Sequence, residues 1–526
     1  MVVGIMRVTE YTSISRRLLS ASVLRVANLF ATAMASFFVM PFLVHHLGDR
    51  TYGFWSLATV FVGYYNLLDV GLSIAVSQHM SVAIGRKDAS ECRAVFNTAL
   101  RVQSVLGAIA LLATVVIAVA VPSIGHAHSD AQLFRNVILI LGTTTALGFP
   151  ARVYGGVLEA ELRFDIRAWL GLLVLALRTG LSVWVVVTGH GLLLLAWAMV
   201  IPSIPDMVLQ VLLARRAVRW ARIDHVSVGS QRTKSIVSYS AYTTVAYIAD
   251  ILRFQIDPLV ISSLIGLAAV THYRVAGALA QYHLQMVIMA VGMLWPILSR
   301  LHGAGDQSRV EEVFFSGTKL SCCLSVFICV ALIAWGKVFI ARWMGPRYED
   351  GYLPLVALSI AVFLDVGQKP SIDILYATFK NRVYMCINWV EGILNLAFSL
   401  ALARPLGIFG VALGTLIGAF VVRIMLQPWW VCKVTGFHYA GYMRFFGKNL
   451  LRCTCLAGVA VVTAAWGLRP SYLWLVSSAV FATAVYAAGS WLVILNRRER
   501  ELMLGALRKT HGRKQSELAP FAAAIR

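Results

Sequence analysis

The sequence predicts an all-α integral membrane protein with about 14 transmembrane helices, built as two pseudo-symmetric six-helix bundles plus two C-terminal helices. Three observations lead to this prediction. Of the 526 residues, 59% are hydrophobic and 13% are charged, whereas a soluble chain is about 45–50% apolar and about a quarter charged. Apolar runs of about 20 residues, enough to cross the hydrocarbon core, recur along the chain. The two halves also share a pattern of glycine, aspartate and proline.

The apolar runs are separated by short gaps, so no predicted loop is long enough to form a soluble catalytic domain. The edges of the runs are defined to within roughly three residues. The predicted spans lie near 22–45, 52–79, 97–121, 135–158, 169–188, 191–213, 236–264, 270–298, 318–340, 352–378, 384–403, 407–431, 449–468 and 472–495.

The first run resembles a secretory signal peptide in one respect, because an Ala-x-Ala-x-Ala sequence at 31–35 is spaced like a cleavage site. However, Arg25 and Asn28 fall inside what would be the uncharged segment, and the apolar run continues to Leu47. We therefore expect an uncleaved first transmembrane helix.

Most Lys and Arg residues fall on one predicted side of the membrane. Positive charges favour cytoplasmic loops, and they fill the N-terminus, the gaps after even-numbered spans and the C-terminal tail. The opposite gaps contain only Arg50, Arg135, Arg342, Arg347, Arg404 and Arg469. Both termini are therefore expected in the cytoplasm. The formal net charge of +22 follows from this topology and does not indicate a nucleic-acid partner.

The predicted organisation has six parts. They are a cytoplasmic N-terminus (1–21), an N-terminal six-helix bundle (22–213), a basic cytoplasmic linker (214–235), a C-terminal six-helix bundle (236–431), two additional transmembrane helices (432–495) and a basic cytoplasmic tail (496–526). The tail can lie on anionic lipid or contact a partner enzyme.

The two halves repeat with an offset of about 218 residues. The shift pairs Gly48 with Gly266, Gly85 with Gly303, Asp88 with Asp306 and Ser90 with Ser308. It spans an even number of helices, so the repeats share one orientation, as in transporters built from parallel repeats. Chance similarity among helices rich in leucine and alanine is the alternative.

The 8 cysteines lie in predicted spans or cytoplasmic gaps, so we expect no structural disulfide. No CxxC or CxxH spacing indicates a metal site, and no Walker motif indicates an ATP site. We expect no cofactor.

Three charged residues interrupt the predicted seventh span. Asp250, Arg253 and Asp257 follow steps of three and four residues along one helical stripe, just before Pro258. A charge at the bilayer centre costs several kcal/mol, roughly +2.5 to +3.5 on the insertion scale, so the stripe is expected to face away from lipid. The stripe indicates either the wall of a polar cavity or a structural ion pair, and Pro258 is expected to kink the helix.

Other polar residues fall inside or beside predicted spans. Arg25 and Asn28 share a stripe on the first span, Arg50 precedes the second, and Arg274 begins the eighth. Arg25 and Arg274 can also extend toward the headgroups. The remaining charges are Asp69, Arg101, Arg178, Asp206, Asp365, Lys369, Asp373, Glu391 and Arg423. Arginines in a polar cavity favour a transporter for an anion, and lone carboxylates such as Asp69, Asp365 and Glu391 are candidates for a coupling ion.

Three segments carry a resemblance to a known family: PFLVHHLGDRTYGFWSL (41–57), YYNLLDVGLSIAVSQHMS (64–81) and DPLVISSLIGLAAVTHYRVAGALA (257–280). The chain resembles a polysaccharide flippase of the Wzx type, within the multidrug/oligosaccharidyl-lipid/polysaccharide (MOP) exporter superfamily. The resemblance implies a fold like that of MATE transporters and MurJ-type flippases, with alternating access to a central cationic cavity.

The resemblance also implies a substrate. It is an undecaprenyl-diphosphate-linked oligosaccharide, flipped from the cytoplasmic to the periplasmic leaflet of the inner membrane for O-antigen, capsule or exopolysaccharide assembly. Related flippases for lipid-linked peptidoglycan precursors place arginines on helices one, two and eight around the diphosphate. Arg25, Arg50 and Arg274 occupy similar places, although Arg50 lies in a loop. A polysaccharide polymerase and a chain-length regulator are the implied protein partners, besides membrane lipid.

Two sets of candidate residues follow. Those for binding the diphosphate or sugars are Arg25, Arg50, Arg274, Arg253, Asn28, Tyr239 and Tyr242. Those for ion coupling or cavity charge are Asp69, Asp250, Asp257, Asp365 and Glu391. We expect no catalytic residue.

Two other classes of function compete with this interpretation. A drug/cation antiporter of the same superfamily shares the fold, and the mixed charges of Asp250, Arg253 and Asp257 are compatible with it. A membrane glycosyltransferase or polymerase is the enzyme alternative. Such an enzyme generally needs a sizeable external loop, and the longest predicted one, 122–134, is short.

Overall fold

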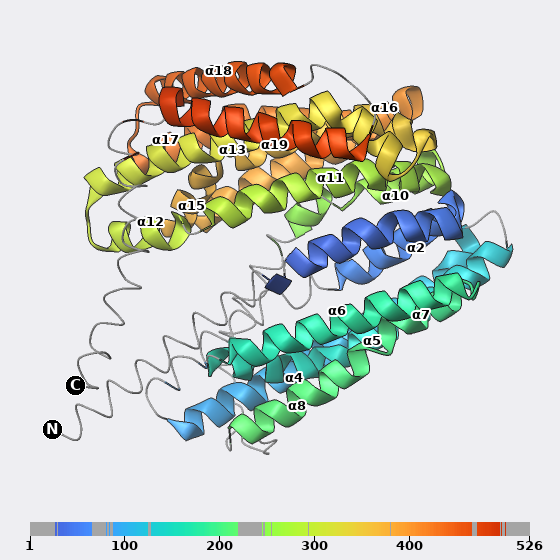
Figure 1. Ribbon diagram of the computed structural model, residues 1–526. Helices are drawn as coiled ribbons and strands as arrows, with labels where there is room; N and C mark the ends of the chain where they lie inside the picture. Colours follow the sequence, from blue (N-terminus) through green and yellow to red (C-terminus); the bar gives the residue numbers. More distant parts are fainter. Residues whose placement is uncertain are drawn as a thin grey trace, which may run out of the picture. The chain divides into compact units, whose positions relative to one another are not determined.

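The structure is a computed structural model, and its described residues group into two compact units. It describes residues 27–28, 30–65, 80, 84, 88–124, 128–161, 163–218, 245, 248–253, 255–292, 294–378, 380–464, 471–494, 496 and 500. Throughout these ranges the secondary structure is helical (Figure 1), and ten helical segments are long and apolar enough to cross a membrane. The predicted all-α membrane fold is confirmed, whereas the count of 14 helices stays a prediction.

The first unit extends to Arg274 and also includes Ala403–Ile408. Phe30–Leu47 forms its first candidate span. Its labelled helices are α2 (Asp49–Tyr64), α4 (Ala89–Ile124), α5 (His128–Ala160), α6 (Phe164–Val187), α7 (Leu192–Val200), α8 (Ser203–Ala217), α10 (Asp257–Leu264) and the first turns of α11 (Leu267–Val291).

The second unit takes the rest of α11 and most of the chain after it. Its helices are α12 (Leu294–Gly303), α13 (Gln307–Trp343), η1 (Pro346–Gly351), α14 (Tyr352–Val366), α15 (Lys369–Ala377), α16 (Asn381–Phe420), the π-helical turn η2 (Val421–Leu426), α17 (Gln427–Thr435), α18 (Tyr439–Ala464), α19 (Tyr472–Gly489) and the π-helical turn η3 (Ser490–Ile494).

Several helices extend beyond the predicted spans. The helices α4, α13 and α18 begin about ten residues before the apolar runs inside them, because hydropathy detects only the part of a helix that is apolar. Elsewhere one predicted span is two helices. The span 191–213 breaks into α7 and α8 at Pro202, since proline lacks the N–H that would continue the helical bonds.

Each unit packs its own apolar core. In the first, α5 lies against α4 and α8 (Figure 1), and a cluster that includes Phe54, Trp55 and Phe134 joins α2 to α5. In the second, α13 packs against α14 and α18, around buried side chains that include Phe363 and Phe446. These contacts hold the helices together by close packing, the main source of helix association in lipid.

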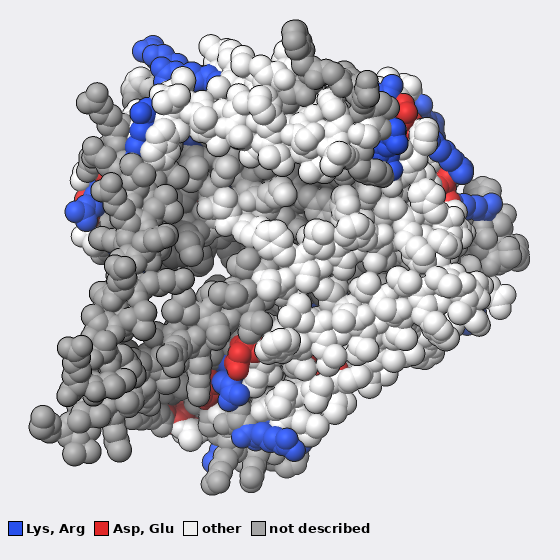
Figure 2. All heavy atoms as spheres, in the orientation of Figure 1, with Lys and Arg blue, Asp and Glu red and all other residues white. Residues whose placement is uncertain are grey.

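Large apolar side chains also cover the outside of the helices. Leu473 is 82% exposed and Val119 is 68% exposed, and Figure 2 shows broad stretches of described surface without acidic or basic side chains. A water-soluble monomer rarely exposes contiguous apolar patches above a few hundred Å². The described part of the chain is therefore a multi-pass membrane protein.

The helices α2 and α11 approach closely at Gly53. A Cβ atom on Gly53 would lie 1.9 Å from the carbonyl oxygen of Leu267, which belongs to the first turn of α11. Only glycine permits this backbone distance. The contact aligns the polar residues of the two helices.

The predicted repeat has a structural basis. Gly48 and Gly266 both adopt a positive φ, of 77° and 136°, immediately before α2 and α11. Asp88 and Asp306 both accept a hydrogen bond from the backbone N–H three residues later, at the starts of α4 and α13. The matched residues therefore make the same local structures in both copies, and chance similarity does not explain this agreement.

The predictions about the cysteines and about the domain boundaries have different outcomes. All eight cysteines are described and free, which confirms the expectation that they form no disulfide. The domain boundaries stay predictions, because residues 219–244, which include much of the predicted basic linker, lie outside the described residues.

Candidate functional site

Each unit contains a cluster of buried or half-buried polar side chains. In the first unit, the α2–α11 cluster comprises Asp49, Ser56, Thr271, His272 and Arg274. In the second, the Arg423 cluster comprises Asp365, Gln368, Asn388, Glu391, Arg423 and Gln427.

Arg274 is held by one of its three guanidinium nitrogens. Its Nε donates to Oγ of Ser56 on α2 at 2.6 Å, and Ser56 is itself buried. The two terminal nitrogens make no hydrogen bond or ion pair with the described residues, so they remain available as donors. A guanidinium fixed through Nε presents two parallel N–H groups, the geometry that binds phosphate or carboxylate oxygens in pairs.

The first turn of α2 is tied to α11 by two further contacts. Thr271 donates from Oγ1 to the carbonyl oxygen of Asp49 at 2.6 Å. The Nε2 of His272 lies 3.5 Å from Oδ2 of Asp49, whose side chain is 4% exposed. Together with the close approach at Gly53, these contacts place Arg274 against Ser56 and fix its direction.

The helical conformation is interrupted just before α10. Gln255 and Ile256 form a turn, and α10 begins at Asp257 with Pro258 in its first turn. The expected interruption at Pro258 is confirmed. The predicted continuous stripe is wrong in one respect, because Asp257 does not share a helix with Asp250 and Arg253. The missing N–H of Pro258 is the physical reason.

The three charges of this segment differ in burial. Arg253 and Asp257 are 3% and 4% exposed, whereas Asp250 is half-buried. The hydroxyl of Tyr273 on α11 donates to Oδ2 of Asp257. Asp257 therefore has a partner inside the first unit, which fits the structural alternative as well as a cavity wall.

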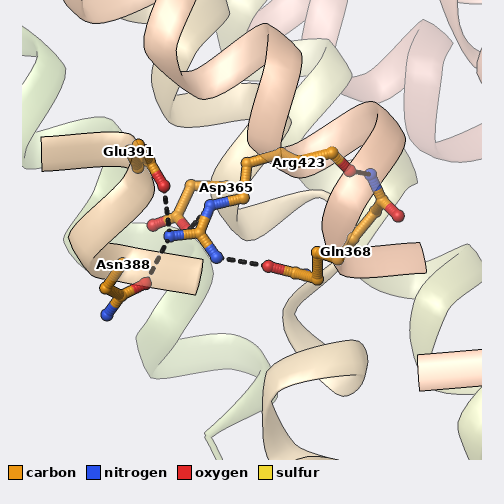
Figure 3. A network of polar contacts seen from close by, with 6 residues as sticks. Asp365, Gln368, Asn388, Glu391 and Arg423 are labelled. Carbon is orange, nitrogen blue, oxygen red and sulfur yellow. Dashed lines mark hydrogen bonds and ion pairs between the residues drawn. The ribbon is translucent and has the colours of Figure 1, made fainter. Parts of the chain in front are cut away.

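The Arg423 cluster surrounds one fully buried guanidinium (Figure 3). The Nη2 of Arg423 lies 2.6 Å from Oε2 of Glu391 on α16, and its Nε lies 3.3 Å from Oδ1 of Asp365 on α14. Nη2 also donates to Asn388 at 2.9 Å, and Nη1 donates to Gln427. Two carboxylates and one guanidinium give this buried cluster a formal charge of −1.

Backbone geometry and further hydrogen bonds orient the cluster. Arg423 lies in the π-helical turn η2, a rare turn that often occurs at functional sites. The backbone carbonyl of Arg423 accepts from Gln368 at 3.1 Å, and Gln368 in turn accepts from Tyr442 on α18 at 2.8 Å. The network therefore joins α14, α16, α17 and α18 through polar contacts.

Only some of the candidate residues named from the sequence lie within the described part of the chain. Arg25, Asp69, Tyr239 and Tyr242 lie outside the described residues. Asn28 donates to the backbone of Ala168 on α6 at 3.3 Å, so it packs between helices of the first unit. The expectation that Arg50 lies in a loop is wrong, because α2 begins at Asp49 and Arg50 is an exposed residue of its first turn.

The sequence suggested that Asp365 and Glu391 are lone carboxylates. That expectation is wrong, because both lie beside the guanidinium of Arg423. Sequence reasoning named Arg423 as a charge within a span but not as a site residue, and it missed Ser56 and His272. Three pairs in this cluster have helical spacing, Asp365 with Gln368, Asn388 with Glu391 and Arg423 with Gln427, and this spacing is the local signal that could have indicated polar helix faces.

Comparison with known proteins identifies a family and a set of relatives. A family model described as "Polysaccharide biosynthesis protein" matches residues 42–353, more than half of the chain. The uncharacterized membrane protein EpsK of Bacillus subtilis is 22% identical over 516 residues, covering 92% of this chain and 98% of that protein. A putative O-antigen transporter of Shigella flexneri is 23% identical over 414 residues, covering 76% and 96%.

Solved structures with the same fold are also found. An inward-facing multidrug resistance MATE family transporter of the MOP superfamily aligns with a TM-score of 0.62 at 15% identity, covering 78% of this chain and 98% of that one. The lipid II flippase MurJ, in an inward closed conformation, aligns with a TM-score of 0.61 at 12% identity, covering 91% and 98%. These likenesses establish the fold, and the predicted MATE- and MurJ-like architecture is confirmed.

Proposed function

The chain belongs to the polysaccharide biosynthesis protein family, and from that premise we propose that it is a flippase for a lipid-linked oligosaccharide. The substrate is an undecaprenyl-diphosphate-linked repeat unit for O-antigen, capsule or exopolysaccharide assembly. The protein moves it from the cytoplasmic to the periplasmic leaflet of the inner membrane by alternating access. Both termini lie in the cytoplasm, and the chain acts as a transporter rather than as an enzyme.

One observation carries the proposal beyond family membership. The guanidinium of Arg274 is fixed by Ser56 through Nε, which leaves two terminal nitrogens for a ligand. A diphosphate offers several anionic oxygens that accept charge-assisted hydrogen bonds from such a fork. A cation would be repelled at the same place, so the geometry supports an anionic substrate over a cationic drug.

The physics of the membrane suits this substrate. The prenyl tail can stay in lipid while the sugar and diphosphate cross a polar path, so the protein does not need to enclose the whole molecule. An anion moving outward from a negative interior gains about 2.3 kcal/mol per charge per 100 mV. The membrane potential therefore assists transport in the proposed direction.

The other candidate residues keep proposed roles. Arg25, Arg50, Arg253, Asn28, Tyr239 and Tyr242 complete the substrate site, and Asp69, Asp250 and Asp257 supply cavity charge or ion coupling. For Asp365 and Glu391 the contacts with Arg423 support a role in positioning helices of the second unit as well as ion coupling. A polymerase and a chain-length regulator are the proposed protein partners.

The test is genetic and chemical. Deleting the gene in its host should reduce surface polysaccharide and accumulate undecaprenyl-diphosphate oligosaccharide on the cytoplasmic side. Complementation with Arg274→Ala should fail at verified expression, and Arg274→Lys should restore transport in part, because lysine keeps the charge but not the paired donors. The matched control is Arg309→Ala, because that arginine is 71% exposed in a surface ion pair with Asp306.

One result would contradict the proposed function, and another would contradict only the role of Arg274. Unchanged polysaccharide together with increased drug sensitivity in the deletion strain would assign the protein to the antiporter class. Full complementation by Arg274→Ala would leave the flippase assignment in place but remove Arg274 from the substrate site.

A further inference from the structure

A polar cavity lies inside the first unit, apart from the α2–α11 cluster. Its volume is about 190 Å³, and residues of α5, α6 and α8 line it. Its lining is mostly polar or charged: Thr144, Thr145 and Arg152 from α5, Arg178 from α6, and Ser203, Asp206 and Gln210 from α8. The proposed function gives no role to any of these residues.

The cavity lies deep within the helices. Arg178 is 14 residues from Phe164, the first residue of α6, or about 21 Å along the helix axis at 1.5 Å per residue. Asp206 is 11 residues from Ala217, the last residue of α8, or about 16 Å. The hydrocarbon core is about 30 Å thick, so both charges lie well inside it, where charged residues usually mark a substrate or ion pathway.

Arg178 is incompletely satisfied. Its Nη2 donates to Oγ of Ser203 at 2.7 Å, whereas its Nε is buried and has no hydrogen-bond partner. A buried N–H without a partner costs about 1–3 kcal/mol, and more when the group is charged. Its Nη1 makes no hydrogen bond or ion pair with the described residues and is not fully buried, so it is the donor that a group entering the cavity can reach.

Arg178 and Asp206 line the same cavity without forming an ion pair. Oδ2 of Asp206 accepts from Nε2 of Gln210 at 2.9 Å, and no contact within 4 Å joins it to Arg178 among the interactions of these two described residues. If Arg178 and Asp206 served only to neutralise each other's charge in lipid, their side chains would be expected to form a direct ion pair. The separation leaves space between opposite charges.

A second guanidinium makes the cavity cationic. Arg152 also lines it, and its Cζ lies 4.6 Å from the ring centroid of Phe149, so a cation–π contact helps to position this side chain. Two arginines and one aspartate give the lining a formal charge of +1. The hydroxyl groups of Thr144, Thr145 and Ser203 add further polar contacts.

We propose that this cavity binds one anionic group of the transported molecule, through the guanidinium of Arg178 and with the positive charge of Arg152 on the same lining, as a second anion site besides Arg274. Pockets that enclose a drug-sized ligand measure about 300–1,000 Å³, so this cavity takes a single phosphate or a single carboxylated sugar and not a whole oligosaccharide. Asp206 opposes the anion and keeps its affinity low enough for release. The identity of the transported molecule rests on the proposed function, but the preference for an anion does not.

The experiment measures binding without transport. The full chain is purified in lipid nanodiscs in the Arg274→Ala background, so that Arg274 does not contribute to the binding, and comparison with the Arg178 variant isolates the cavity. Inorganic pyrophosphate, glucuronate and uncharged glucose are titrated, and binding is followed by calorimetry and by the shift in melting temperature. Pyrophosphate and glucuronate distinguish a phosphate from a sugar carboxylate as the bound group.

Two variants should have opposite effects on anion binding, and a third serves as their control. Arg178→Gln should weaken anion binding at least tenfold, and Asp206→Asn should tighten it, because one change removes a favourable charge and the other an opposing one. Arg167→Gln is the matched control on α6. Its guanidinium forms an ion pair with Glu159, with side chains 40% and 38% exposed, so this variant should bind like its parent.

The proposal is overturned by any of three results. In the first, neither anion binds above glucose. In the second, tetramethylammonium, a cation small enough for this cavity, binds instead and Asp206→Asn abolishes its binding, which would make the cavity a cation site. In the third, both single variants lower the melting temperature without changing anion affinity and the double variant restores it, which would make the two residues a structural pair. If Arg178→Gln weakens anion binding and Asp206→Asn tightens it, the cavity site is supported even when the deletion strain retains its polysaccharide.

Discussion

The guanidinium of Arg423 and the carboxylate of Glu391 form an ion pair with no access to solvent. Their Nη2–Oε2 distance is 2.6 Å, and the side chains are 0% and 2% exposed. Asp365 approaches the same guanidinium from α14. Because each charge would be costly alone in a dry interior, the helices α14 and α16 and the turn η2 depend on one another through Arg423.

The first prediction concerns the removal of this guanidinium. Arg423→Gln should lower the free energy of unfolding of the full chain by about 3–5 kcal/mol, because two carboxylates would remain buried without their cation. Thermal unfolding of the purified protein in detergent measures the effect. Glu391→Gln is the control and should cost less, since it leaves Arg423 paired with Asp365 at a formal charge of zero. Equal melting temperatures for Arg423→Gln and wild type would show that the cluster contributes nothing to stability.

The second prediction concerns the contact of α2 with α11. Gly53→Ala should destabilise the protein by more than the about 1–3 kcal/mol that is typical of overpacking, because the new Cβ would lie 1.9 Å from a backbone oxygen, which cannot rotate away. Gly180→Ala on α6 is the matched control, since a Cβ there has no neighbour within 4 Å. Fluorescence-detected size exclusion should give a folded peak for the control and a reduced one for Gly53→Ala. A normal peak for both would mean that α2 and α11 are farther apart.

The third prediction concerns the repeated helix caps. Asp306→Ala should cost about 0.5–2 kcal/mol, the usual range for losing a side-chain cap, because Oδ1 of Asp306 accepts from the N–H of Arg309 at 3.2 Å. Asp306→Ser should retain most of the stability. Glu311→Ala, an exposed change one turn later on α13, provides the baseline. The idea fails if Asp306→Ala and Glu311→Ala melt together.

The caps at Asp88 and Asp306 are an example of the features of the fold that the sequence could predict. Span-length apolar runs locate membrane helices because the bilayer sets their length, and the match of Asp88 with Asp306 is readable because a cap needs a particular residue type at one position. Pro258 likewise predicts a helix break through its missing N–H. These are local effects, and the sequence carries them directly.

The Arg423 cluster is different. Asp365, Glu391 and Arg423 come from α14, α16 and η2, and no periodicity relates residues on separate helices. The same applies to Arg178 and Asp206, whose shared cavity depends on how α6 and α8 pack. Sequence reasoning found these charges because they lie in apolar runs, but only three-dimensional packing identifies their partners.

The fourth prediction concerns pH. Glu161 lies just beyond the last residue of α5, and burial raises the pKa of its carboxyl above the ordinary value, while Arg163 opposes that shift. A raised pKa in the folded state means that ionisation of Glu161 weakens folding once the pH exceeds the unfolded value of about 4.3. Glu161→Gln should therefore melt like wild type near pH 4 and above it at pH 7. A difference that is constant over this range would contradict the assignment.

The fifth prediction tests the charges that precede α10. Asp250 and Arg253 precede the turn at Gln255, whereas Asp257 follows it and accepts a hydrogen bond from Tyr273. If Asp250 and Arg253 line the substrate path, each single change, Asp250→Arg or Arg253→Asp, should abolish complementation of the deletion strain. The exchanged double variant should fail as well, because the path then presents its charges in the wrong places.

Tyr273→Phe should lower the melting temperature by leaving the buried carboxylate of Asp257 without this donor, and transport at permissive temperature should persist. Recovery of transport in the exchanged double variant would show that the pair has only to be complementary, and the cavity role of these residues would then have to be given up.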